Sequence, residues 1–157
     1  MGLFNLFRRE PTPNEVLLDG LQRNLVSVCE RALRTGAQPD VVIDSRGFNA
    51  LHYAVGKGYT NIVQLLLDCG ADPNYRNPLT RHTHLMLAVI YEKTEALELL
   101  LKKGAKPNFR CSIGEKTEET PLHFATRRAK LREDSIAYRH TDGKLVEILK
   151  AYGATEE

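Results

Sequence analysis

The stretch that decides the fold is Thr120-Pro121-Leu122-His123-Phe124-Ala125. Two earlier stretches have the same pattern, Asn49-Ala50-Leu51-His52-Tyr53-Ala54 and Thr83-His84-Leu85-Met86-Leu87-Ala88. Each begins with a side chain that can accept hydrogen bonds from the first amides of a helix. The Leu and the Ala that follow, three residues apart, lie on one face of that helix. The three stretches therefore predict three equivalent helices, each with an apolar face.

A second apolar helix follows in every unit and ends at a Gly-Ala pair. These pairs are Gly36-Ala37, Gly70-Ala71, Gly104-Ala105 and Gly153-Ala154, and the first three are 34 residues apart. Gly ends helices because it adopts left-handed backbone at little cost, and the Pro that follows the first three pairs prevents continuation. Units that cannot bury their apolar faces alone are expected to stack.

This pattern resembles the ankyrin repeat family, whose signature is Thr-Pro-Leu-His-x-Ala within a period of about 33 residues. The match in the last copy is complete, and the resemblance covers residues 14–154. It implies an all-α solenoid of about four helix-turn-helix repeats joined by β-hairpin-like loops. Residues 14–40 lack the signature and are expected to form a degenerate N-terminal cap. We expect residues 1–12 to be a tail and residues 13–157 to be the repeat domain.

The last unit departs from the period by an insertion of about 12 residues between its two helices, near residues 129–141. Insertions in repeat proteins often lie on the binding face, and long loops are usually either functional or disordered. Two interpretations stay open. In the first, the inner helix is extended and carries a basic and aromatic patch for an acidic partner; in the second, the segment is a solvated loop. The patch residues are Arg127, Arg128, Lys130, Arg132, Tyr138 and Arg139.

The resemblance also implies where a partner would bind, because the family uses a concave surface of hairpin tips and inner helices. Carried over by position, that surface contains Arg46, Phe48, Lys57, His82, Ile90, Tyr91, Lys116, Glu119, Arg127 and Arg128. Exposed aromatic and aliphatic side chains beside Arg have the composition of interface hot spots, which favours Phe48, Ile90 and Tyr91. The alternative is that Phe48 and Tyr91 only pack on neighbouring loops.

The composition does not indicate a charged partner or an oxidising compartment. Lys and Arg number 22 against 20 Asp and Glu, a net charge of +2, which favours neither nucleic acid nor a membrane surface. Three widely spaced cysteines do not form a closed disulfide set and indicate free thiols in a reducing compartment, so we expect a cytoplasmic protein. Cys111 is expected to be the most exposed of the three.

Catalytic patterns are weak. No glycine-rich phosphate loop follows a strand, and His82 and His84 lack the further ligands of a zinc site. His52 and His123 are expected to hydrogen-bond backbone groups of neighbouring hairpins. The sequence therefore predicts a non-catalytic protein-protein interaction module, an adaptor or scaffold. It is expected to need no cofactor, metal or small-molecule substrate and to be monomeric when free.

Three other functions remain as alternatives. The first is a dedicated inhibitor or an immunity or antitoxin-type protein that blocks a target protein. The second is an adaptor tethered to a membrane through residues 1–9. The third is an enzyme that uses the inserted segment and His123.

Overall fold

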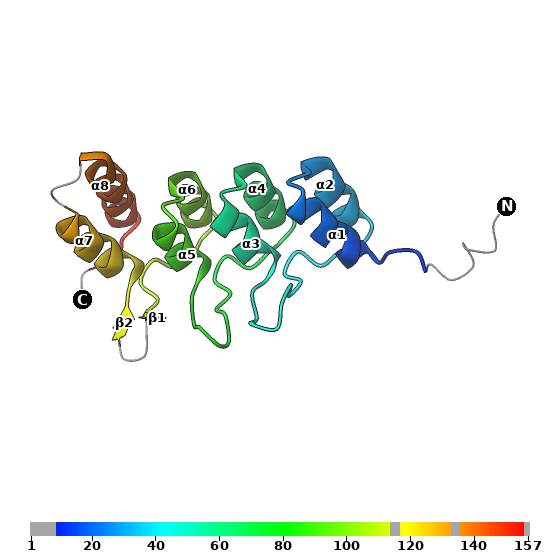
Figure 1. Ribbon diagram of the computed structural model, residues 1–157, viewed down its shortest axis with the longest axis horizontal. Helices are drawn as coiled ribbons and strands as arrows, with labels where there is room; N and C mark the ends of the chain where they lie inside the picture. The colour runs from blue at the N-terminus through cyan, green and yellow to red at the C-terminus, as the bar shows by residue number, and fades with distance from the viewer. Residues whose placement is uncertain (1–8, 114–116, 133–135, 156–157) are drawn as a thin grey trace.

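The computed structural model describes residues 9–113, 117–132 and 136–155, and these residues form four consecutive helix pairs. The pairs are α1 (Pro13–Gln22) with α2 (Val26–Arg34), α3 (Ala50–Lys57) with α4 (Thr60–Asp68), α5 (His84–Ile90) with α6 (Thr94–Lys102), and α7 (Pro121–Leu131) with α8 (Ile136–Ala151). Figure 1 shows the pairs side by side along the long axis, and the inner helices α1, α3, α5 and α7 pack on one another in sequence order. The predicted all-α solenoid is confirmed.

Long connections leave the helix layers on one side and form what we call fingers: finger 1 (residues 38–48), finger 2 (residues 72–82) and finger 3 (residues 106–119). Figure 1 shows them projecting below the helices. In finger 3, β1 (Cys111–Ile113) pairs antiparallel with β2 (Thr117–Glu119), and Cys111 lies opposite Glu119. Fingers 1 and 2 are each closed by one isolated antiparallel bridge, Val42 with Asn49 and Arg76 with Thr83.

The inner helices begin where the sequence predicts. The side chains of Asn49, Thr83 and Thr120 each accept a hydrogen bond from the backbone amide three residues on, at 2.9, 3.2 and 3.2 Å. Thr12 caps α1 in the same way, at 3.3 Å, and the Glu15 carboxylate accepts a hydrogen bond from the Thr12 amide at 2.8 Å. These bonds satisfy amides that a helix start otherwise leaves unpaired, so they fix where each repeat begins.

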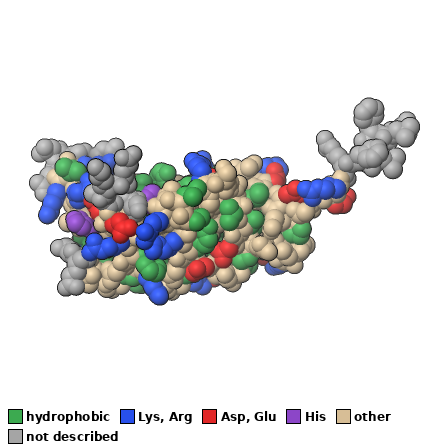
Figure 2. Space-filling model, turned by 90° about the horizontal axis from the view of Figure 1, so that it is seen from below, with side chains coloured by type: hydrophobic (Ala, Val, Ile, Leu, Met, Phe, Trp, Pro, Cys, Tyr) green, Lys and Arg blue, Asp and Glu red, His purple; other side chains and the backbone are tan. Residues whose placement is uncertain are grey.

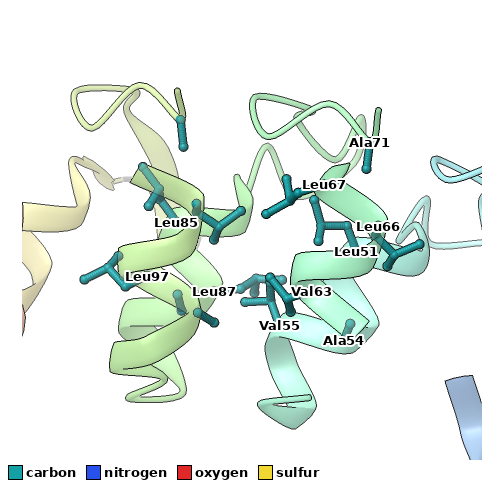
Figure 3. Packing of buried hydrophobic residues seen from close by; sticks show 14 of the residues in the cluster. Leu51, Ala54, Val55, Val63, Leu66, Leu67, Ala71, Leu85, Leu87 and Leu97 are labelled. Atoms are coloured by element: carbon teal, nitrogen blue, oxygen red, sulfur yellow. The ribbon is translucent and has the colours of Figure 1, made fainter. Parts of the chain in front are cut away.

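The core is a row of equivalent layers. Leu51, Leu85 and Leu122 are at most 1% exposed, and the Ala three residues after each is fully buried. Figure 3 shows two adjacent layers, with Leu51 and Leu66 in one and Leu85 and Leu97 in the next. Gly20 holds the position of these alanines in the first unit, where a Cβ would lie 2.8 Å from the Cys29 Sγ. The first unit therefore keeps its two helices close by having no side chain there.

A row of carboxamide and carboxylate side chains joins each repeat to the next at the base of the fingers. We call it the finger-base ladder, and its members are Asn14, Asp40, Asn74 and Asn108. The first three accept a hydrogen bond from a backbone amide of the following unit, from Gln38 at 2.8 Å, Asp72 at 3.0 Å and Lys106 at 2.8 Å, and Asn108 accepts one from Thr155, just after α8, at 3.0 Å. The fingers are therefore fixed relative to one another as well as to their own helices.

None of the helices in the described ranges is both long and apolar enough to cross a bilayer.

Candidate functional site

The concave side of the solenoid contains a hollow of about 450 Å³ between finger 1 and two inner helices, which we call the finger pocket. Ile43, Asp44, Arg46 and Phe48 of finger 1 form one wall. The floor and the opposite wall come from α3 and α5, through His52, Tyr53, Gly56, Lys57, Leu87 and Tyr91. Its size lies within the range of ordinary ligand pockets. The side chains that line it combine aromatic surface with a few charged groups.

The wall from finger 1 is held by hydrogen bonds within the finger. The Asp44 carboxylate accepts bonds from the backbone amides of Arg46 and Phe48, at 3.0 and 3.2 Å, and from the Arg46 Nε at 3.0 Å. Partial burial acts to raise the pKa of Asp44, but these bonds and the Arg46 charge outweigh it and lower the pKa. Asp44 is therefore ionised at neutral pH and holds Arg46, whose guanidinium lies 5.3 Å from the centre of the Phe48 ring.

Finger 2 supports finger 1 from behind. The Asn77 side chain donates to the Arg46 carbonyl at 2.8 Å, and the Tyr75 hydroxyl donates to the Gly47 carbonyl at 3.1 Å. Gly47 has a φ of +78°, and a Cβ there would lie 2.8 Å from the Pro78 Cδ. The pocket wall is thus fixed before any partner arrives, which lowers the entropy cost of binding.

Two buried histidines lie at the floor of the pocket: His52 lines it, and His84 packs against His52. The His52 Nδ1 and the His84 Nε2 are 2.7 and 3.1 Å from the same Asn49 Oδ1, and the two ring centroids are 4.1 Å apart. Burial lowers the pKa of His52 to about 4 and holds that of His84 well below its usual value. Both rings are neutral at physiological pH. The Asn49 backbone amide also donates to the His52 Nδ1 at 3.4 Å, and the His84 Nδ1 lies 3.3 Å from the Pro73 carbonyl.

The structure brings four of the predicted binding residues together in the finger pocket: Arg46, Phe48, Lys57 and Tyr91. Tyr91 is 53% exposed, and the Lys57 ammonium lies 5.7 Å from the centre of the Tyr53 ring. His82 and Ile90 lie nearby but are half-buried, and Ile90 packs against the core. Whether these residues bind a partner stays a prediction.

The remaining predicted residues belong to the last repeat and lie outside the pocket. Glu119 pairs with Arg127 at 3.1 Å, and Arg127 also covers the Phe124 ring, 5.3 Å from its centre. Lys130 is exposed at the end of α7. Lys116 lies outside the described residues, and so does the side chain of Tyr138, whose backbone belongs to α8. Figure 2, seen from the finger side, shows Lys and Arg side chains gathered toward these C-terminal repeats.

Arg128 departs from the exposed basic patch that the sequence suggested. It is 8% exposed, and its Nε donates to the fully buried Asp142 of α8 at 2.7 Å. Its Nη1 donates to the Val89 and Ile90 carbonyls at the end of α5, at 2.8 and 3.2 Å. The side chain turns inward because helix-end carbonyls and a carboxylate satisfy it there. It therefore joins the last repeat to the one before.

The described part of the insertion lengthens the two helices of the last repeat. α7 has 11 residues, against 8 and 7 in α3 and α5, and α8 has 16, against 9 in α4 and α6. This agrees with the extended inner helix, one of the two interpretations of the sequence. Arg132, in the C-cap of α7, binds Glu92 of the preceding repeat at 2.7 Å.

The cysteines are free thiols as predicted, but the prediction that Cys111 is the most exposed of them was wrong. Cys111 is fully buried beneath finger 3, its Sγ 3.8 Å from the Thr83 hydroxyl, and Cys69 at the end of α4 is the exposed thiol. The β1 and β2 pairing turns Cys111 inward, and the sequence alone gives no indication of that orientation. Within the described residues, no three His, Cys, Asp or Glu side chains gather in a way that could hold a metal ion.

Sequence reasoning missed Ile43 of finger 1 and, on the inner helices, two large apolar residues of the pocket, Tyr53 and Leu87. Both occupy the x position of the repeated Leu-His-x-Ala or Leu-Met-x-Ala pattern, and Phe124 has that position in the last copy. A large apolar residue at the same place in all three copies, four residues after the helix cap, was the available indication that this position faces the fingers.

Comparison with known proteins finds ankyrin repeats in the middle of the chain, from finger 1 to the start of α8. A family model described as "Ankyrin repeat" matches residues 46–78, and one described as "Ankyrin repeats (3 copies)" matches residues 69–138. The ankyrin repeat-containing protein F37A4.4 of Caenorhabditis elegans is 30% identical over 90 residues. That alignment covers 57% of this chain and 8% of the relative, so the matched segment is a small part of a much longer relative.

Proposed function

The chain belongs to the ankyrin repeat family, and from that premise we propose that it is an adaptor or scaffold that holds another protein in its concave face and fingers. Ankyrin repeats are generally protein-protein interaction modules, and the family is typically non-catalytic. Within this chain, we propose that residues 13–157 form the binding domain and that residues 1–12 are an appended tail.

The observation that carries the proposal is the finger pocket. It joins a pre-formed finger wall to large apolar side chains of two successive inner helices. Tyr91 leaves 53% of its surface exposed there, although burying such a ring would be favourable. An exposed aromatic side chain in a fixed concave setting is typical of an interface anchor.

Electrostatics in the described residues favour binding over catalysis. The two histidines at the pocket are neutral and buried, so neither ring presents an exposed nitrogen to a substrate. Asp44, the carboxylate that lines the pocket, is committed to Arg46 and to two backbone amides. A general base needs a free proton acceptor within reach of a substrate, and these groups are either buried or already paired.

We further propose that the protein works in the cytoplasm, as a monomer when free. Support comes from its free thiols, two of which are buried in the repeats, because reduced cysteines are typical of a reducing compartment.

The test is affinity capture from cell lysate with the immobilised chain, followed by mass spectrometry. The Phe48→Ala/Tyr91→Ala variant should lose the captured proteins. The matched control is Glu98→Ala/Lys102→Ala, which removes an exposed ion pair on α6 and should keep them. Arg128 is left unchanged because it is buried and structural. Partners kept equally by the concave variant and the control would contradict the proposal.

A further inference from the structure

The finger pocket has an apolar depression that the chain does not fill itself. Phe48 and Tyr53 are half-buried, Leu87 is buried below them, and Tyr91 is largely exposed. Gly56, in the last turn of α3, has no side chain to cover this surface. A Cβ added at Gly56 would lie 3.7 Å from the Tyr91 Cε2, an ordinary contact distance, and would meet only that ring. The space next to Tyr91 is therefore wide enough for a side chain.

Of the charged side chains that line the pocket, Lys57 has no ion-pair partner among the other two. Asp44 and Arg46 form an ion pair at 2.9 Å, so these two neutralise one another. Lys57 is exposed and, in the described part of the chain, makes no ion pair; its recorded contact is with the Tyr53 ring. Glu92, just after the end of α5, lines an adjacent hollow together with Lys57, but the Glu92 carboxylate already binds Arg132 at 2.7 Å. The rim of the pocket is therefore positive at Lys57.

We propose that the finger pocket binds an extended segment of the partner protein that places a large apolar side chain against Tyr91 and an Asp or Glu beside Lys57. The apolar surface around Tyr91 would bind the large side chain as an anchor. The unpaired Lys57 ammonium favours a segment with an acidic residue beside that anchor, because complementary charges at an interface mainly determine which partner binds. This inference rests on the proposed binding function and specifies the chemistry of the partner.

The probe is a phage-displayed library of random peptides about a dozen residues long, selected on the immobilised wild-type chain. Enriched peptides should carry Asp or Glu within a few residues of a Leu, Ile, Phe, Tyr or Trp. Synthetic copies of the enriched sequence are then titrated against the chain by fluorescence anisotropy. Their affinity should fall as salt is added, since an exposed ion pair is screened.

Three variants separate the two parts of the pocket. Lys57→Glu reverses the rim charge and should weaken the acidic peptide about tenfold, while Lys102→Glu, the same change in the last turn of α6, should alter affinity less than about twofold. Gly56→Leu fills the space beside Tyr91 and should weaken the peptide at least about tenfold. The same variant should melt at an equal or higher temperature, because Leu favours a helix more than Gly does. If Gly56→Leu binds the peptide more weakly but is as stable as the wild type, the peptide binds in the finger pocket.

Several outcomes would overturn the inference. They are an enriched set without acidic residues, a library that yields no peptide, and equal peptide affinities for Lys57→Glu and Lys102→Glu. The lysate capture with Phe48→Ala/Tyr91→Ala judges the proposed function separately. If Phe48→Ala/Tyr91→Ala no longer captures the proteins but the peptide tests give a contradictory result, the proposed acidic segment is wrong and the proposed binding function is kept. If Phe48→Ala/Tyr91→Ala captures the same proteins as the wild type, the proposed binding function is wrong.

Discussion

Acidification should destabilise this protein through the two histidines buried next to the finger pocket. His52 is 2% exposed and His84 is fully buried, and their ring centroids lie 4.1 Å apart. Burial is the main cause of the lowered pKa of both rings, and for His84 the neighbouring His52 adds to the effect. Protonation of either ring would place a charge in the core, and a charge on both would add repulsion.

The sign and size follow from linkage. The pKa of His52 falls from 6.5 in the unfolded chain to about 4 in the folded one, so below pH 6.5 the unfolded state binds the proton more tightly. The stability from neutral His52 is therefore complete above about pH 6.5 and is lost progressively as the pH falls toward 4. Between about pH 7.5 and pH 5.5 the loss is about 1.4 kcal/mol for His52 alone. His84 adds a loss of the same sign.

The assay is urea unfolding of the wild type, His52→Gln and His123→Gln at those two pH values. The wild type and the His123→Gln control, whose replaced residue is exposed, should lose the same stability on acidification. His52→Gln should lose about 1.4 kcal/mol less, because one buried imidazole no longer takes up a proton. An equal loss in His52→Gln and the wild type would refute the argument.

Three further substitutions should be measurable by urea unfolding at neutral pH. Arg128→Met leaves the buried Asp142 with only Arg132, 3.8 Å away, and should cost about 3–5 kcal/mol, whereas adding Asp142→Leu should recover much of that loss. Thr120→Ala removes the cap of α7 and should cost about 1 kcal/mol, with Thr120→Ser as a near-neutral control. Gly47→Ala forces a side chain into left-handed backbone against Pro78 and should cost more than about 1 kcal/mol.

Each of these expectations has a distinct contradictory result. If the Arg128→Met/Asp142→Leu pair proved as unstable as Arg128→Met alone, the unpaired carboxylate would not be the cause of the loss. An unchanged midpoint for Thr120→Ala would mean that the α7 cap adds nothing to stability. Tolerance of Gly47→Ala without loss would mean that finger 1 relaxes away from Pro78.

The repeated elements were predictable because each rests on local chemistry. The caps at Asn49, Thr83 and Thr120 and the glycines that end the outer helices are short-range features. The same rules apply to Thr12 and Glu15, which form a capping box at the start of α1. The start of α1 could therefore have been predicted from the sequence.

The residues that sequence reasoning placed poorly depend on contacts between repeats. Arg128 was expected at the surface because its partners, Asp142 and the carbonyls of α5, lie 14 and about 40 positions away. Cys111 is buried because finger 3 pairs its strands and turns the thiol toward Thr83. The pocket itself joins finger 1 to α5, so Leu87 enters it from a different repeat than Phe48. Such encounters follow from stacking geometry and not from the pattern within one repeat.

The finger-base ladder implies that unfolding can stop at a boundary between repeats. The bonds of Asn14, Asp40 and Asn74 each cross to the next unit, and replacing Asn74 removes those to the Lys106 amide and the Gly104 carbonyl. The last repeat would then be held to the rest by helix packing and by Arg128 and Arg132, and it should open before the earlier repeats. Amide hydrogen exchange would register this as two protection levels that change at finger 3, with the finger pocket in the protected block.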